Sequence, residues 1–335
     1  MLLSPGTRTT GTGAQEYAIT GPGWRGALPP GVVQVKAPTA LVWIVGRIYC
    51  TGTPEDYAAV HVLQDSCKLT PLSAYGTAWT PPRGRVDRAL DMRTPVRKQV
   101  AALDAADFFT IFAGLLAANP PAAADAPMLP QLAQLGVVPG KPFDRGAFDV
   151  DLAWLLPKAA AARLAAYAKF GDAFRSAGGW KYTLKTGTYG TDYLQRALIA
   201  AIGLGACLPQ DAVYPISKKD GSGDTYSGTK RYVLRFPNGA MPPVRAFWSL
   251  TMYDEQGFFV ANPLNRYSIS PRQNLRSNPD GSVDLLIQHE SPGAANESNW
   301  LPAPAGTFSL MLRLYWPAES PPSILDGTWL PPPVK

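Results

Sequence analysis

The stretch RAFWSLTMYDEQGFFVANPLNRYSIS, residues 245–270, decides the architecture of the C-terminal part of the chain. Residues 246–253 are rich in aromatic, β-branched and apolar side chains, a composition typical of β-strands. This run is followed by a polar turn sequence that ends in glycine and then by a second apolar run over residues 258–261. The pattern predicts a β-hairpin. Beyond the hairpin lies a polar and aromatic segment that contains Asn265, Arg266 and Tyr267. Because β-sandwiches present binding groups on loops at strand ends, we expect a ligand site here.

The rest of the C-terminal sequence also predicts strands, at residues 231–236, 283–288 and 308–315. Residues 278–281, Asn-Pro-Asp-Gly, are a strong turn signal, because glycine adopts a positive φ without steric cost. Short strands joined by proline-rich connections favour a jelly-roll-like double β-sheet.

The N-terminal residues predict β structure as well, with strand-length runs at 17–19, 32–35 and 41–49. The last run is almost entirely apolar, as in a central strand, but it contains Arg47. Two interpretations of Arg47 stay open. In the first, Arg47 lies at an edge or on an alternating face of the sheet. In the second, it faces a cleft and binds an anion or a carbonyl group. The second rests on the high cost of burying an unpaired guanidinium.

Apolar side chains recur at helical spacing in the middle of the chain, which predicts helices over residues 94–116, 126–135, 157–177 and 192–202. The last of these helices begins beside four side chains that are able to line a pocket: Tyr189, Asp192, Tyr193 and Arg196. The alternative is a capped helix whose Asp192 and Arg196 form a surface ion pair at i, i+4 spacing.

These patterns predict a multi-domain, mainly β, α+β protein. An incomplete β-sandwich is expected over residues 1–80, a helical module over residues 81–180 and a jelly-roll module over residues 181–335.

The bulk composition excludes several classes of protein. The net charge of +6 is mild and the basic residues are spread thinly, so we expect no nucleic-acid binding. No uninterrupted apolar run is long enough to span a membrane, and the first residues do not read as a signal peptide. The three cysteines, Cys50, Cys67 and Cys207, are expected to be buried free thiols, with a disulfide between the first two as the alternative in an exported protein.

The sequence offers little for metal or nucleophilic catalysis. A zinc site needs three or four ligands, and the chain has only His61 and His289. No Gly-x-Ser-x-Gly elbow is present, so a Ser/His/Asp triad is not expected, and we predict neither a metal nor a cofactor. Acid–base chemistry by carboxylates is the mechanism that depends least on histidine, and Asp192 is one candidate for it.

Aromatic and polar residues favour a small-molecule ligand, because rings with guanidinium and amide edges suit sugars or aromatic acids. The predicted catalytic residues are Tyr253, Arg266 and Asp192. The predicted ligand-binding residues are Arg47, Tyr189, Tyr193, Arg196, Trp248, Asn265, Tyr267 and Trp300. For each tryptophan taken singly, a place in the core is the alternative.

Two functions from different classes follow. One is an enzyme, of the hydrolase or lyase class, that acts on a small anionic or aromatic substrate in a cleft between modules. The other is a non-catalytic envelope or extracellular module that binds a ligand or partner; a purely structural scaffold is a third. We expect a monomer or a small homo-oligomer.

Several sequence blocks, in this order and spacing, resemble the bacterial family that pairs the domains of unknown function 1254 and 1214. The blocks are SPGTRTTGTG, LVWIVGRIYCTGTPED, YGTDYLQRA, AFWSLTMYD, NPLNRYSIS, NPDGSVDLLIQ, NWLPAP and LRLYWP. The resemblance implies a β-sandwich, a helical middle and a C-terminal jelly roll. It also implies a chain that starts inside the first module, and a periplasmic or secreted location. Where the family usually has Asn-Gly-Trp, this chain has Gly178-Gly179-Trp180. The resemblance carries no activity with it.

Overall fold

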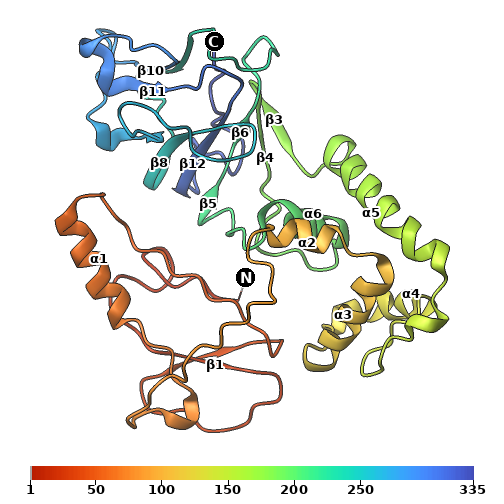
Figure 1. The fold of residues 1–335 in the computed structure, drawn as a ribbon. Helices are drawn as coiled ribbons and strands as arrows, with labels where there is room; N and C mark the ends of the chain where they lie inside the picture. The colour runs from red at the N-terminus through yellow and green to blue at the C-terminus, as the bar shows by residue number, and fades with distance from the viewer. Residues whose placement is uncertain (1) are drawn as a thin grey trace. The chain divides into compact units, whose positions relative to one another are not determined.

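The computed structural model describes residues 2–335 and divides them into two compact units (Figure 1). The larger unit contains residues 3–11 and 159–335, and the smaller unit contains residues 12–158 together with Leu2. The fold class is mixed α+β with several sheets, as the sequence predicts. Each unit is described by itself below.

The larger unit is built on two sheets. The seven-stranded sheet has the order β3-β4-β6-β12-β8-β9, with β5 also paired to β12. Its strands are β3 (Arg175–Ala177), β4 (Trp180–Tyr182), β5 (Ala212–Val213), β6 (Ile216–Ser217), β8 (Val244–Tyr253), β9 (Ser268–Ile269) and β12 (Ser309–Pro317). The three-stranded sheet has the order β11-β10-β7, formed by β7 (Tyr232–Phe236), β10 (Val283–Gln288) and β11 (Trp300–Pro302). The predicted C-terminal double sheet is therefore present.

One apolar core holds both sheets together. Side chains alternate along a strand, and the inward residues Trp248, Leu250 and Met252 of β8 and Leu310, Leu312 and Leu314 of β12 are buried. These buried residues, such as Leu250 and Leu312, join Leu234 and Leu285 of the other sheet in a single cluster. Burial of each such side chain stabilises the fold by about 1.5–3 kcal/mol, so this core is the main source of stability of the larger unit.

The prediction that residues 258–261 form the second strand of a hairpin with β8 is wrong. Residues 258–261 form no strand, and β8 instead pairs antiparallel with β9, with Leu250 opposite Ile269. The reason is local: Asp254 Oδ1 accepts the backbone N–H groups of Gln256 and Phe258, at 2.9 and 2.8 Å, which closes a tight polar turn. The chain then makes a wide loop before it returns to the sheet.

The helices of the larger unit begin where the sequence signals them, with one exception. Helix α6 (Tyr193–Gly203) starts after Asp192, whose Oδ1 accepts the N–H of Gln195 at 3.1 Å. Helix α5 (Val150–Phe170), whose residues 150–158 belong to the smaller unit, begins seven residues before the predicted start at Pro157, which lies inside it. It also ends earlier than predicted, because residues 175–177 form β3. Short 3-10 helices, η4 (Pro271–Gln273) and η5 (Ala294–Asn299), flank β9 and β11.

The smaller unit contains one two-stranded parallel sheet and several helices. The sheet pairs β1 (Tyr17–Thr20) with β2 (Val33–Lys36). The helices are α1 (Pro54–Ser66), α2 (Val96–Ala101), α3 (Ala105–Ala118) and α4 (Leu129–Gln134), with the 3-10 segments η1 (Leu72–Ala74), η2 (Ala123–Met128) and η3 (Arg145–Ala147). Thr53 and Asp104, residue types that favour the N-cap position, accept N–H groups of the first turns of α1 and α3.

Residues 41–49 are not the central strand that the sequence predicts. They have no regular secondary structure, and Leu41 and Trp43 are 73% and 65% exposed. An apolar run becomes a strand only when a neighbouring strand accepts its backbone hydrogen bonds, and the sheet of this unit ends at two strands. The expectation for the cysteines is confirmed in part: all three are free, but Cys50 and Cys67 are exposed and Cys207 is half-buried rather than buried.

No helix among residues 2–335 is both long enough and apolar enough to cross a bilayer.

Candidate functional site

The outer face of the seven-stranded sheet carries the most chemically distinctive group of side chains in the larger unit. On β8 and β12 the residues that point away from the core are paired in register: Tyr253 with Ser309, Ser249 with Arg313, and Phe247 with Tyr315. All six side chains are aromatic or polar and part-exposed, and the pair Thr251–Met311 between them contains a buried threonine. Regular alternation along two long strands therefore places a row of aromatic and polar groups on one face.

Arg313 lies at the centre of this row. Its guanidinium donates to the hydroxyl of Thr251 and to the hydroxyl of Tyr253 on the neighbouring strand. It also lies 5.7 Å from the centre of the Tyr253 ring, within the range of a cation–π interaction. No carboxylate of residues 2–335 forms an ion pair with Arg313. The structure therefore holds a part-buried positive charge with neutral partners only.

Three stacked rings continue from Tyr253. The ring of Phe259 stacks on Tyr253 with centroids 5.5 Å apart, and the ring of Tyr267 lies 5.1 Å from that of Phe259, with interplanar angles of 22° and 19°. Phe259 is 57% exposed although it is a large apolar residue. The three nearly parallel rings form an aromatic platform whose exposed member, Phe259, is accessible to a ligand ring.

The loop that places this platform is organised by Asn262. Its side-chain amide donates to the carbonyls of Val260 and Arg266, at 3.0 and 2.9 Å, and its oxygen accepts the N–H of Arg266 at 3.0 Å. Asn265 in the same loop has a positive φ of 49°, a conformation that asparagine tolerates better than most residues. The Asn-Pro pair is thus the structural anchor of the loop.

Arg266, predicted to be catalytic, holds backbone instead. Its Nη1 donates to the carbonyl of Glu297 at 2.5 Å and to that of Trp300 at 2.9 Å, at the end of η5. Because the last carbonyls of a helical turn lack partners within it, a guanidinium there ties the loop after β8 to β11. The structure gives Arg266 a positioning task in the fold.

The two tryptophans among the predicted ligand-binding residues lie inside the molecule. Trp248 is 3% exposed and packs against Phe236 in the core, with ring centroids 5.3 Å apart. Trp300 is 4% exposed and donates its ring N–H to the carbonyl of Gln288 at 2.9 Å. Both occupy positions that support the sheets from within.

A separate cluster surrounds the start of α6. Tyr189 accepts the N–H of Gly187 through its hydroxyl at 3.0 Å, and the Arg196 guanidinium lies 5.5 Å from the centre of the Tyr193 ring. Asp192 caps the helix, as described above. The predicted residues of this cluster come together at the start of α6. Arg47 belongs to the smaller unit.

A second aromatic–arginine group lies further along the same outer face. Phe247 stacks on Tyr315 with centroids 4.5 Å apart, and the Arg272 guanidinium lies 4.9 Å from the Phe247 ring. Trp316 follows at a β-bulge with a positive φ of 50°, and its buried ring N–H has no partner among the described residues. A bulky residue in this conformation stores backbone strain, which clusters at functional positions.

Sequence reasoning missed Arg313. It is the only charged residue in the run SLMLRLYWP of β12, and alternation puts it on the face opposite Leu312. That pattern is the same signal that singles out Arg47, and applying it to β12 would have identified Arg313. For metals, no group of three or more His, Cys, Asp or Glu side chains in the described part of the chain is able to hold an ion.

The fold and the face together define a class: a mixed α+β protein whose C-terminal double sheet carries aromatic and arginine side chains on its outer surface. The chain belongs to the family that pairs two domains. Residues 1–71 match "Protein of unknown function (DUF1254)" and residues 211–319 match "Protein of unknown function (DUF1214)". The second match begins at Asp211 and covers β8, β9 and β12, and with them the outer face.

Two solved structures resemble this one. The VPA0106 protein from Vibrio parahaemolyticus is 25% identical, with a TM-score of 0.66, over 98% of this chain and 77% of that chain. An uncharacterized protein from Burkholderia cenocepacia is 17% identical, with a TM-score of 0.27, over 58% of this chain and 46% of that one. No protein with a curated description matches the chain.

Proposed function

We propose that the outer face of the seven-stranded sheet binds a small organic ligand that carries a flat ring and an anionic group. The observation that supports it most is Arg313, a part-buried guanidinium held by two hydroxyl groups and paired with no carboxylate. A guanidinium has five N–H donors, and the two protein contacts use only two of them. The remaining donors suit the planar, bidentate recognition of a carboxylate.

The ring platform supplies the second half of the recognition. Phe259 is exposed and stacks beside Tyr253, whose hydroxyl accepts a hydrogen bond from Arg313. A ligand ring stacked there would place its carboxylate near the guanidinium, and stacking adds about 0.5–1.5 kcal/mol beyond the area that is buried. The combination supports an aromatic carboxylate over a sugar, because a guanidinium beside stacked rings matches an anionic group joined to a flat ring.

The proposal is one of binding. Among the predicted catalytic residues, Asp192 caps α6 and Arg266 holds backbone carbonyls, so their contacts support no proton transfer at this face. Tyr253 remains at the site as the partner of Arg313. The same geometry therefore favours a ligand-binding module over the hydrolase or lyase that the sequence also suggested.

The test uses three matched probes on the whole chain: benzoate, the uncharged benzamide and the ringless anion acetate. Calorimetry should show benzoate binding more tightly than either of the others. In Arg313→Gln, loss of a charge-assisted hydrogen bond of about 1.5–3 kcal/mol should weaken benzoate by roughly 10- to 150-fold. Arg235→Gln, an exposed arginine paired with Asp280 on the other sheet, is the control and should bind normally. Equal binding of benzoate and benzamide would rule the proposal out.

A further inference from the structure

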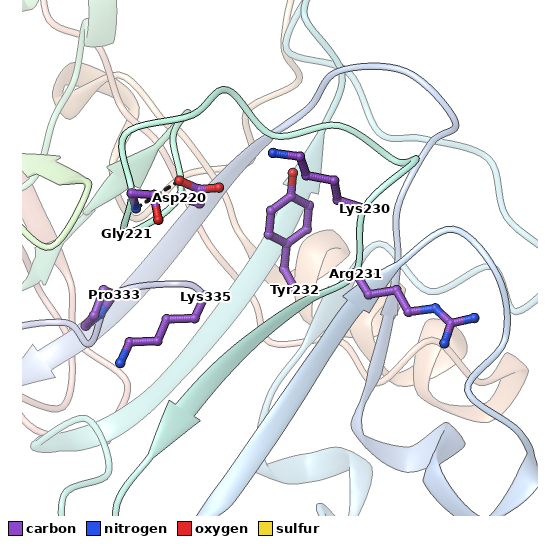
Figure 2. Close-up of a pocket in the computed structure, with 8 residues that line it drawn as sticks. Asp220, Gly221, Lys230, Arg231, Tyr232, Pro333 and Lys335 are labelled. Carbon is purple, nitrogen blue, oxygen red and sulfur yellow. Dashed lines mark hydrogen bonds between the residues drawn. The ribbon is translucent and has the colours of Figure 1, made fainter.

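A hollow in the larger unit is lined by none of the residues of the outer face. It measures about 420 Å³ and is formed by the loop at Asp220, the start of β7 and the last residues of the chain. Figure 2 shows the Asp220 carboxylate and the ends of Lys230 and Tyr232 directed toward the same space, with Lys335 below them and Arg231 extending away. Nothing in the proposed function uses these residues.

Asp220 is the most informative residue of the hollow, because it is a carboxylate that is only 9% exposed. Its Oδ1 accepts the backbone N–H groups of Ser222 and Asp224, at 2.9 and 3.0 Å. Its Oδ2 has no partner among the described residues and is not sealed from the hollow that the residue lines. A nine-tenths buried carboxylate with one open oxygen needs a hydrogen-bond donor there.

The Asp220 loop is rigid in its present form. The N–H of Gly221 donates to the carbonyl of Val334 at 2.7 Å, which fastens the loop to the end of the chain. The N–H of Asp220 donates to the carbonyl of Asp224 at 2.8 Å and closes the loop on itself. The open oxygen is therefore fixed in position before any ligand arrives, which reduces the entropy that binding would cost.

The remaining charges around the hollow are mostly positive. Lys230, Arg231 and Lys335 line it together with Asp220. Asp224 takes one of the three donors of the Lys230 ammonium, at 3.1 Å, and leaves the other two for a ligand. Tyr232 accepts the N–H of Ser227 at 2.9 Å through its hydroxyl oxygen, so its own O–H remains able to donate. The hollow thus combines several donors with one lining side-chain carboxylate, that of Asp220.

We propose that this hollow binds inorganic phosphate. A phosphate ion offers unprotonated oxygens to Lys230 and Tyr232 and keeps at least one P–O–H group throughout the neutral range, which the open oxygen of Asp220 accepts. Sulfate has the same shape and charge type but no proton near neutral pH, so its oxygens would meet the Asp220 carboxylate without a hydrogen bond. A phosphate monoester loses its second proton near pH 6 and meets the same repulsion at higher pH. A metal ion is disfavoured by the three surrounding cations.

The experiment is calorimetric titration of the whole chain at pH 8 and constant ionic strength with phosphate, sulfate and glycerol phosphate. Phosphate should bind at least about tenfold more tightly than sulfate or glycerol phosphate, because only phosphate donates a charge-assisted hydrogen bond to Asp220 at this pH. Equal binding of phosphate and sulfate, or no phosphate binding up to tens of millimolar, would overturn the proposal. Calcium binding that competes with phosphate would overturn it as well.

Asp220→Asn is the diagnostic variant, because an amide oxygen still accepts the two backbone N–H groups that shape the loop. We expect this variant to lose the preference for phosphate over sulfate, because it should bind phosphate more weakly and sulfate more tightly than the wild type does. Lys230→Gln should weaken both anions together, whereas Lys181→Gln, an exposed lysine on β4, should change neither. Retained selectivity in a folded Asp220→Asn would contradict the assignment. The wild-type selectivity decides the matter if that variant does not fold.

Discussion

The hydroxyl oxygens of Ser217 and Tyr226 lie 2.8 Å apart in the interior of the larger unit, where both side chains are almost fully buried. Ser217 Oγ also lies 3.0 Å from the carbonyl of Gly179 and 2.8 Å from that of Lys219. Ser217 has one proton to give to these carbonyls, so Tyr226 is the donor in the bond between the two hydroxyls. This contact joins β6 to the Asp220 loop and leads to the first prediction.

Tyr226→Phe should change how stability depends on alkaline pH. Burial raises the pKa of Tyr226 above its usual value of 10.0, against the opposing hydrogen bond to Ser217. A raised pKa means that the folded state keeps the proton longer, so its contribution is complete below about pH 10 and is lost as the pH rises further. The free energy of unfolding of the variant should be about 1 kcal/mol lower than that of the wild type at pH 7. Above pH 10 it should fall less steeply than that of the wild type. Urea unfolding from pH 7 to 11 measures this, with the exposed Tyr57→Phe as control.

Gly228→Ala should destabilise the larger unit strongly. A Cβ atom at Gly228 would lie 1.7 Å from the carbonyl oxygen of Pro304, so the two backbone segments would have to separate. We expect the free energy of unfolding, measured by heat or urea, to fall by at least about 3 kcal/mol, which is the upper end of the usual cost of an overpacking substitution. Gly306→Ala lies in the contacting loop but meets open space, and should change stability by less than about 1 kcal/mol. Similar losses in both variants would contradict the close approach.

Asp280→Asn should weaken the turn between β9 and β10 at neutral pH only. The hydroxyl and backbone N–H of Ser282, with a further contribution from Arg235, lower the pKa of the Asp280 carboxyl below its usual 3.8. A lowered pKa stabilises the folded state above the unfolded value, and this stabilisation disappears as the pH falls through the folded value. The difference between wild type and variant should therefore be present at pH 7 and vanish well below pH 4. Glu319→Gln, the same substitution type at an exposed carboxylate, is the control.

Arg266→Ala should reduce stability and leave ligand affinity unchanged. The side chain donates to the carbonyls of Glu297 and Trp300, and its removal leaves these acceptors without the guanidinium, at about 1–3 kcal/mol. Arg276→Ala is the matched control, because its exposed guanidinium has only one long contact, at 3.4 Å to the carbonyl of Ala295. It should cost less than about 0.5 kcal/mol. Lost benzoate binding in a folded Arg266→Ala protein would place the residue at the ligand after all.

Tyr253→Phe should weaken benzoate less than Arg313→Gln does, and the two effects should not add. The hydroxyl of Tyr253 acts through Arg313 by orienting its guanidinium, so its removal has no further effect once the guanidinium is gone. We expect about a three- to tenfold loss for Tyr253→Phe alone, equivalent to one neutral hydrogen bond. A double-mutant cycle by calorimetry measures the coupling, and strictly additive losses would show that the two residues act separately.

Local sequence signals predicted local structure well. Thr53, Asp104 and Asp192 cap the helices that follow them, because a side-chain oxygen next to the first turn satisfies N–H groups within a few residues. The long strand over residues 246–253 is confirmed by β8, because its alternation reflects burial on one face. The site was predicted less well. Of the residues expected to bind ligand, Tyr267 joins the Tyr253 stack, whereas Trp248 supports the core.

The sequence by itself determined where strands, turns and caps fall, since each depends on residues a few positions apart. The tertiary structure alone decided that β9 rather than residues 258–261 pairs with β8, and that Arg313 reaches Tyr253 from sixty residues away. It also decided that residues 41–49 remain outside any sheet. The physical reason is the same in each case. A strand's partner, and the surroundings of a charge, depend on which distant segments offer backbone groups and apolar area, and no window of sequence contains that information.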